Sequence, residues 1–180
     1  TDTSGAGRTD DLTQSIHYGE VSQQIQAFVA GHTFQLLERV AEELAEELLL
    51  TVPRLEQVDL EVKKPWAPVG LPLETVSVEI TRGWHTAYVA LGSNLGEREA
   101  YLNGAVQALR ETRGCRVEQV SAFRDTAPYG YTDQGEFLNG CLRLRTLLSP
   151  LRLLDRLHEI EQAAGRERKI HWGPRTLDLD

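Results

Sequence analysis

The sequence lacks the features that define several classes of protein. It has two cysteines among 180 residues, Cys115 and Cys141, far apart and without C-x-x-C spacing, so neither a disulfide framework nor a zinc site is supported. No apolar run approaches the roughly 20 residues that span a bilayer, and the first residues lack the charged and then apolar layout of a signal peptide. We therefore expect a cytoplasmic protein with no membrane partner, whose cysteines are small buried hydrophobic residues.

The chain also lacks an excess of positive charge. With 19 basic and 27 acidic residues its net charge is −8, which argues against a nucleic-acid partner, because a general nucleic-acid surface needs a broad basic stripe. The hydrophobic fraction of 41% is typical of a globular chain, and the length suits one large or two small domains. Any site for an anionic ligand must therefore be local.

Hydrophobic periodicity predicts helices and then strands in the first part of the chain. Residues 1–13 are small and polar and predict a loop. Apolar residues at helical spacing predict a helix near 21–29 and a stronger one over 33–50. Alternating residues predict half-buried strands at 58–62 and 76–80, separated by a proline-rich loop.

The second part has a different order of elements. We expect a strand at 86–91, a helix around 102–109, strands at 116–123 and 137–146, a helix from Ser149 to Gly165, and a last strand at TLDLD. This β-α-β-β-α-β order is the ferredoxin-like pattern, and it predicts the α+β class.

The segment HWGPRTLDLD combines carboxylates with nearby cations. If it is a strand, the period of two places Leu177 and Leu179 on one face and Asp178 and Asp180 on the other. Two carboxylates suit magnesium, which is typically held by one or two carboxylates together with phosphates and water. The upstream cations Arg166, Arg168, Lys169 and Arg175 suit phosphate oxygens. Phosphoryl-type transfer is one interpretation, and an edge strand with solvated acids is the other.

Two further loops carry candidate ligand groups. Residues 92–96, GSNLG, follow a strand and precede a helix, where a phosphate could meet backbone N–H groups, although a plain structural turn is the commoner explanation of such a motif taken alone. Thr126, Pro128, Phe137 and Asn139 could form a pocket for a planar ligand, with an aromatic wall and an amide that pairs with a heterocycle. The competing interpretation is a core phenylalanine and a turn-capping asparagine.

The order of these motifs is more specific than any one of them. ALGSNLG, FRDTAPYG, FLNG, IEQAAGRERK and WGPRTLDLD, taken from about Thr86 to Asp180, resemble the hydroxymethyldihydropterin pyrophosphokinases. That family transfers pyrophosphate from ATP to 6-hydroxymethyl-7,8-dihydropterin. The resemblance implies a pterin substrate, ATP as co-substrate and two Mg²⁺ ions.

The resemblance also implies roles for individual residues. Asp178 and Asp180 would bind the metal ions, and Arg166 and Arg175 would be catalytic by neutralising charge on the phosphates. Residues expected to bind the pterin are Thr126, Pro128, Phe137, Asn139 and Trp172. His158 and Glu161, on the exposed side of their helix, and Arg168 would contact the nucleotide, and residues 167–172 would form a lid that excludes water.

The first half resembles a second family of the same pathway. DDLTQSIHYGEV, FQLLERVAEELAEELL, KKPWAP and VSVEITR are similar to dihydroneopterin aldolase, which needs no cofactor for its retro-aldol cleavage to hydroxymethyldihydropterin and glycolaldehyde. Glu38 would anchor the pterin, Tyr18 would lie over the ring or assist proton transfer, and Lys64 would be the general acid and base. Without the resemblance, all three are ordinary surface residues.

Together the resemblances predict a multifunctional folate-biosynthesis enzyme. We expect an aldolase-like domain of the tunnelling fold at 1–83, lacking its first strands, and a ferredoxin-like pyrophosphokinase domain at 84–180, lacking its last part. We expect homo-oligomers through the aldolase half, and low activity of this chain alone in both reactions. Two alternatives are a catalytically inactive oligomerising scaffold and a ferredoxin-like RNA-binding module, although no strand carries the aromatic pattern of the latter.

Overall fold

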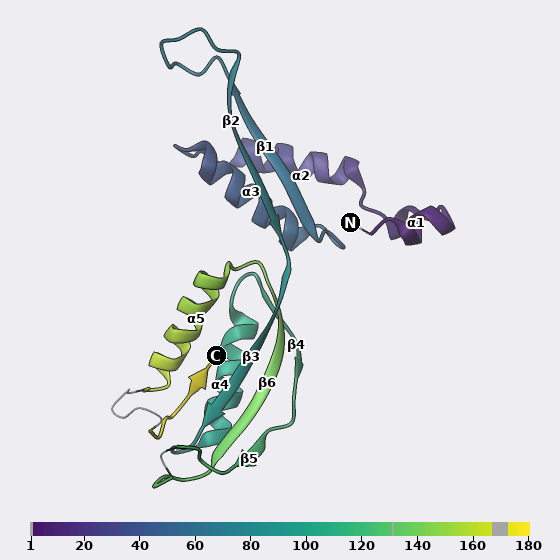
Figure 1. The fold of residues 1–180 in the computed structure, drawn as a ribbon. Helices are drawn as coiled ribbons and strands as arrows, with labels where there is room; N and C mark the ends of the chain where they lie inside the picture. The colour runs from purple at the N-terminus through teal and green to yellow at the C-terminus, as the bar shows by residue number, and fades with distance from the viewer. Residues whose placement is uncertain (1, 131, 167–172) are drawn as a thin grey trace. The chain divides into compact units, whose positions relative to one another are not determined.

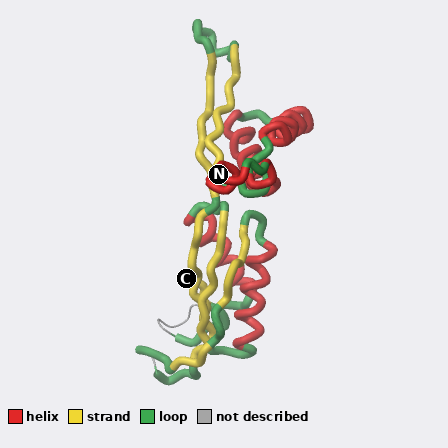
Figure 2. Tube along the Cα trace, turned by 90° about the vertical axis from the view of Figure 1, so that its right-hand side faces the viewer, coloured by secondary structure: helices red, strands yellow, loops and turns green. Residues whose placement is uncertain are grey.

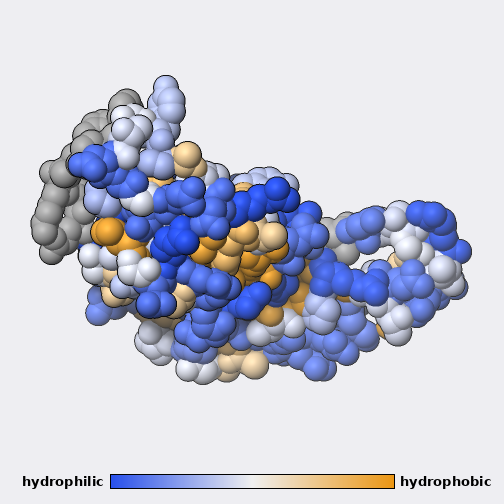
Figure 3. Space-filling model, turned by 90° about the horizontal axis from the view of Figure 1, so that it is seen from below, coloured by the Kyte–Doolittle hydropathy of each residue, from blue (hydrophilic) through white to orange (hydrophobic). Residues whose placement is uncertain are grey.

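The chain folds into two compact units, Thr1–Trp84 and His85–Asp180, in a computed structural model that describes residues 2–130, 132–166 and 173–180 (Figure 1). Each unit has its own hydrophobic core. Both combine helices with antiparallel strands, which confirms the predicted α+β class. On the face shown in Figure 3, hydrophilic residues surround smaller hydrophobic areas.

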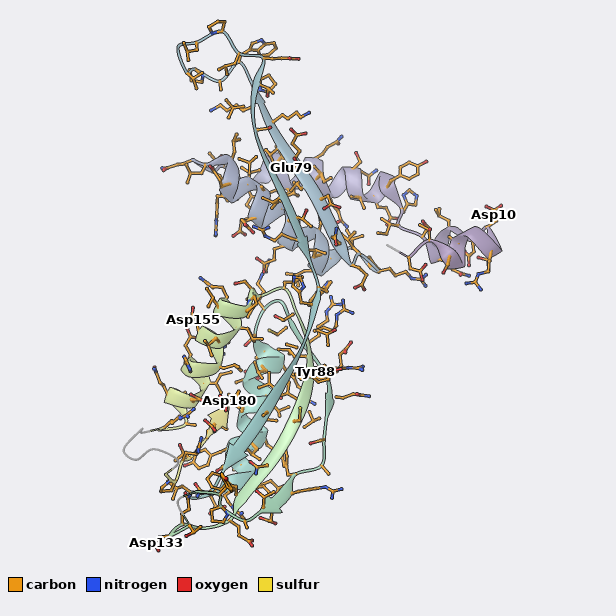
Figure 4. All side chains as sticks on the ribbon, in the orientation of Figure 1. Asp10, Glu79, Tyr88, Asp133, Asp155 and Asp180 are labelled. Atoms are coloured by element: carbon orange, nitrogen blue, oxygen red, sulfur yellow. The ribbon has the colours of Figure 1, made fainter. Side chains whose placement is uncertain are left out.

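The first unit packs two helices against a long hairpin. Its helices are α1 (Ser4–Thr9), the 3₁₀ helix η1 (Leu12–Gln14), α2 (Tyr18–Gly31) and α3 (Leu37–Thr51), and its strands are β1 (Gln57–Pro65) and β2 (Thr75–Gly83). The two strands pair antiparallel over their full length and project beyond the helices (Figures 1 and 2). Figure 4 shows Glu79 on β2 of this hairpin.

Helix α3 supplies most of this core. Leu44 and Leu48 recur at helical spacing, are buried, and pack with Val21, Ile25 and Phe28 of α2 and with Val58 and Leu60 of β1. The helix ends at Thr51 because Pro53 disfavours a helical conformation of the residue before it.

The N-terminal prediction was wrong in part. Residues 1–13 were expected to form a loop, but α1 and the start of η1 lie there, and the Asp11 carboxylate caps η1 by accepting the backbone N–H of Thr13 at 2.9 Å. A six-residue helix without buried side chains leaves no periodic hydrophobic signal to find.

The second unit is a ferredoxin-like sheet with an additional short strand. Its elements are β3 (His85–Ser93), α4 (Arg98–Glu111), β4 (Cys115–Val120), β5 (Arg124–Thr126), β6 (Phe137–Thr146), α5 (Pro150–Ala163) and β7 (Asp178–Leu179). The sheet order is β4-β6-β3-β7, with β5 paired to β6, and every pairing is antiparallel. The predicted β-α-β-β-α-β order is confirmed. The strand expected at 116–123 ends at Val120, and β5 follows inside the expected loop.

One face of this sheet is covered by α4 and α5. Leu102 and Leu109 of α4 and Leu157 of α5 are buried with Leu142 and Leu144 of β6. Alternation along β6 places Cys141 on the opposite face, where it is exposed, so the expectation of a buried residue holds for Cys115 and is wrong for Cys141.

Candidate functional site

A row of three residues crosses the sheet where the candidate side chains meet. The strand register pairs Gly92 of β3 with Asn139 of β6 on one side and with Asp178 of β7 on the other. A Cβ atom on Gly92 would lie 2.8 Å from Asn139 Oδ1 and 3.9 Å from Asp178 Cβ. Glycine is therefore needed here because the two neighbouring side chains close over the backbone of β3.

Asp178 lies between two arginines. Its Oδ1 is 2.5 Å from Arg166 Nη2, and its Oδ2 accepts a hydrogen bond from Arg175 Nη1. All three side chains are largely shielded, with 17% of Asp178, 11% of Arg166 and 23% of Arg175 exposed. With Glu161, which also pairs with Arg166, the cluster contains two arginines and two carboxylates at the edge of the sheet.

Glu161 has a role that the sequence interpretation missed. It was expected on the exposed side of its helix, but it is only 2% exposed, so that expectation was wrong. Its Oε1 accepts the backbone N–H of Leu179 at 2.7 Å and a hydrogen bond from Arg166 Nη1. Glu161 therefore fixes both β7 and Arg166 to the end of α5.

An aromatic and amide wall lies beside this charge cluster. Asn139 Nδ2 donates to Thr126 Oγ1 at 2.7 Å, across the pairing of β5 with β6. The Arg175 guanidinium carbon lies 5.5 Å from the centroid of the Phe137 ring, within cation–π range. Pro128 follows β5 and is half-buried. Four of the five predicted pterin residues thus lie on β5, β6 and the loop between them, and the fifth, Trp172, lies outside the described residues.

Asn94 joins three loops, and the sequence interpretation missed its side chain. Asn94 Oδ1 accepts the backbone N–H of Arg175 at 2.8 Å, and the Asn94 N–H donates to Arg175 O at 3.1 Å. Its Nδ2 donates to Gln134 Oε1 and Gly135 O at 2.9 and 3.2 Å. The asparagine in GSNLG was a signal, because a buried amide needs hydrogen-bond partners, but its partners lie about 40 and 80 residues away.

The predicted nucleotide residues lie at the end of α5. His158, Glu161, Gln162 and Arg166 line a hollow of about 330 Å³. His158 is half-buried there, so His158 and Arg166 face the same space. Arg168 and the expected lid over 167–172 lie outside the described residues.

The carboxylate oxygens of Asp178 and Asp180 are hard ligands of the kind that suit a magnesium ion. Asp180 is exposed at the sheet edge, where its backbone exchanges hydrogen bonds with Ala90 at 2.7 and 3.2 Å (Figure 4). Among the described residues, no group of three or more His, Cys, Asp or Glu side chains could hold a metal. A site of two carboxylates fits magnesium only if phosphates and water complete it.

The predicted aldolase residues are not joined within one chain. Tyr18 begins α2 and is 85% exposed, Glu38 is exposed in the first turn of α3, and Lys64 is exposed near the end of β1. No hydrogen bond or ion pair connects these three in the described part of the chain.

The groups at this site of the second unit suit a protein that holds a polyphosphate beside a planar ligand. Its carboxylates and arginines lie at the edge of an antiparallel sheet, next to an aromatic ring and an amide. The family model for 7,8-dihydro-6-hydroxymethylpterin-pyrophosphokinase matches residues 88–180, and the chain belongs to that family. The dihydroneopterin aldolase family model matches residues 1–81.

Three named relatives are similar to this chain over part of their own length. A bifunctional protein FolKE from Lactococcus lactis subsp. cremoris is 47% identical over 95 residues, covering 53% of this chain and 27% of the relative. The pyrophosphokinase of Bacillus subtilis is 48% identical over 94 residues, which are 52% of this chain and 56% of the relative. The folic acid synthesis protein fol1 of Schizosaccharomyces pombe is 31% identical over 175 residues, 89% of this chain and 24% of the relative.

The chain thus spans between about a quarter and just over half of these relatives. The matches favour a folate-biosynthesis enzyme over the RNA-binding alternative. Within the described residues, none of the helices has the length and apolar character to cross a membrane.

Proposed function

We propose that the second unit transfers pyrophosphate from ATP to 6-hydroxymethyl-7,8-dihydropterin. The observation that carries this proposal is the cluster of Arg166, Asp178 and Arg175 beside Phe137, in a chain that belongs to the pyrophosphokinase family. The cluster supplies charge for phosphates and the neighbouring wall supplies a surface for a heterocycle, so one site can hold both substrates side by side.

Each group has a simple task in this reaction. The substrate hydroxymethyl oxygen forms a bond to the β-phosphorus of ATP while the bond from that phosphorus to the α–β bridging oxygen breaks, which releases AMP and leaves the hydroxyl proton to solvent. Arg166 and Arg175 stabilise negative charge on the transferred group. Asp178 and Asp180 would hold the magnesium ions, which supply Lewis-acid neutralisation of the phosphates when bound.

The pterin would be bound by ring stacking and by hydrogen bonds. Phe137 offers a ring face for stacking, and Trp172 would add a second aromatic surface. The Asn139 amide would pair with the heterocycle edge in exchange for its present bond to Thr126. Pro128 would close the rim, and His158, Glu161 and Arg168 would position the nucleotide, Glu161 through Arg166.

For the first unit, dihydroneopterin aldolase activity is our proposal, supported by the match over residues 1–81. Lys64 would exchange the proton, Glu38 would anchor the pterin and Tyr18 would cover it. Because these residues are unconnected within one chain, we propose that homo-oligomers complete the site, which light scattering on a sizing column would test. A monomer with full aldolase activity would contradict this.

The pyrophosphokinase proposal is tested with the whole chain in two assays. Calorimetry should show saturable binding of hydroxymethyldihydropterin with a nonhydrolysable MgATP analogue, and chromatography should show AMP that requires both substrates. Asp178→Asn should abolish AMP formation, whereas the matched control Asp155→Asn, an exposed aspartate on α5, should not change it. Absence of saturable pterin binding would instead support the inactive scaffold.

A further inference from the structure

Arg98 occupies a position that local helix rules disfavour. It is the first residue of α4, where the helix dipole favours negative rather than positive side chains. Glu97 and Glu99 flank it and fit that preference. The position of this arginine must therefore be explained by contacts outside its own helix.

The Arg98 side chain reaches both ends of the loop between β5 and β6. Its Nη1 donates to Asp125 Oδ1 at 2.8 Å and to Glu136 O at 3.0 Å. Asp125 lies in β5 beside Thr126, and Glu136 directly precedes Phe137 at the start of β6. The backbone pairing of β5 with β6 already joins Thr126 to Phe137, so this guanidinium nitrogen adds a link at the point where the loop leaves the paired strands.

The same loop is held from the same side by Asn94. The Asn94 amide binds Gln134 and Gly135, so Asn94 and Arg98 together contact three consecutive loop residues, 134–136. Asn94 also binds the backbone of Arg175 and therefore serves both halves of the site, whereas the described contacts of Arg98 concern only the pterin half.

We propose that Arg98 is a positioning residue for the pterin pocket, which it supports by bridging Asp125 and Glu136 and so fixing the loop between β5 and β6 where it leaves the paired strands. This inference rests on the proposed pyrophosphokinase function. Arg98 and Asp125 are 34% and 55% exposed, so the pair adds little to stability, and its effect should appear in pterin affinity rather than in folding.

The test compares Arg98→Ala and Asp125→Ala with Arg110→Ala, an exposed arginine in the last turn of the same helix. Calorimetry on the whole chain should show pterin Kd raised roughly threefold to tenfold by the first two variants, which corresponds to about 0.6–1.4 kcal/mol. The Kd for the MgATP analogue should not change. Arg98→Lys should restore part of the affinity, and the double variant should be no weaker than Arg98→Ala.

Hydrogen exchange tests whether Arg98 holds the loop, and this test does not depend on pterin binding. If Arg98 holds the loop, amides of residues 132–136 should exchange faster in Arg98→Ala than in Arg110→Ala, even if the protein binds no pterin. Unchanged exchange and unchanged pterin Kd would overturn the inference. Equal weakening of pterin and nucleotide binding would overturn it too, because it would indicate a general structural role.

Discussion

The Glu161 carboxylate accepts the backbone N–H of Leu179 at 2.7 Å while it is almost completely buried. This bond joins the end of α5 to β7, the strand that carries the candidate metal ligands. The same carboxylate binds Arg166, so removing its charge affects the strand and the arginine together.

We expect Glu161→Gln to lower the free energy of unfolding by about 1–3 kcal/mol, since the amide can still accept from Leu179 but no longer balances Arg166. Urea unfolding at neutral pH measures this. Glu159→Gln is the matched control, because Glu159 on the same helix forms an exposed pair with Arg156 that should contribute less than about 1 kcal/mol. Equal effects of the two variants would contradict the buried role.

Gly92→Ala should damage the pterin site. Its new methyl group would lie 2.8 Å from Asn139 Oδ1, so Asn139 must move or the strand must shift. We expect roughly tenfold weaker pterin binding and a loss of about 1–3 kcal/mol in stability. Gly104→Ala is the control with the same chemical change: no atom lies within 4 Å of its Cβ, and the helical position should gain about 0.5–1 kcal/mol. Unaltered pterin affinity in Gly92→Ala would refute the close approach.

Asp178→Asn and Asp180→Asn should differ in their effect on stability but not in their effect on activity. Asp178 pairs with both Arg166 and Arg175, so its neutral variant leaves Glu161 as the remaining acid beside the two shielded arginines and should lose about 1–3 kcal/mol. Asp180 is exposed, and its variant should stay within about 0.5 kcal/mol of the wild type in thermal unfolding. Both variants should lose magnesium-dependent AMP formation. Normal turnover in Asp180→Asn would remove that residue from the metal site.

The two thiols should react at very different rates. Burial raises the pKa of Cys115, and Cys141 is exposed. Because the thiolate is the reacting form, iodoacetamide at pH 8 should modify Cys141 first and Cys115 mainly after unfolding. Because burial raises the pKa of Cys115, its reaction rate should keep rising with pH above the ordinary thiol pKa, where the rate of an unperturbed thiol levels off. Mass spectrometry of the peptides gives both rates, and equal rates would show that Cys115 is accessible.

The spacing of hydrophobic residues along the sequence was enough to predict several parts of the site. Alternation in TLDLD placed Leu177 and Leu179 in the core and the aspartates away from it, and the structure agrees. Helical spacing also held the signal that was missed for Glu161, because positions 153, 157, 160 and 161 lie on one helix face. An acid on a buried face indicates a fixed partner rather than solvent.

Other contacts could not be predicted from local pattern. Strand β5 has three exposed residues and no measurable alternation, so only its pairing with β6 defines it. The bond of Asn94 to Arg175 joins residues 81 positions apart, and no periodic signal links such loops. Both features depend on the order of the strands in the sheet, which is a tertiary property.

The row Asn139–Gly92–Asp178 places an amide and a carboxylate on either side of one glycine. Two steps of about 4.8 Å between neighbouring strands separate the backbones of Asn139 and Asp178 by about 10 Å. Side-chain substitutions cannot change that separation, since it is set by the backbone hydrogen bonds of β6, β3 and β7. Both side chains nevertheless lean towards Gly92, because a Cβ atom there would lie 2.8 Å from Asn139 Oδ1 and 3.9 Å from Asp178 Cβ. The strand spacing therefore fixes where the two side chains begin, and the missing side chain at Gly92 lets them approach each other across β3.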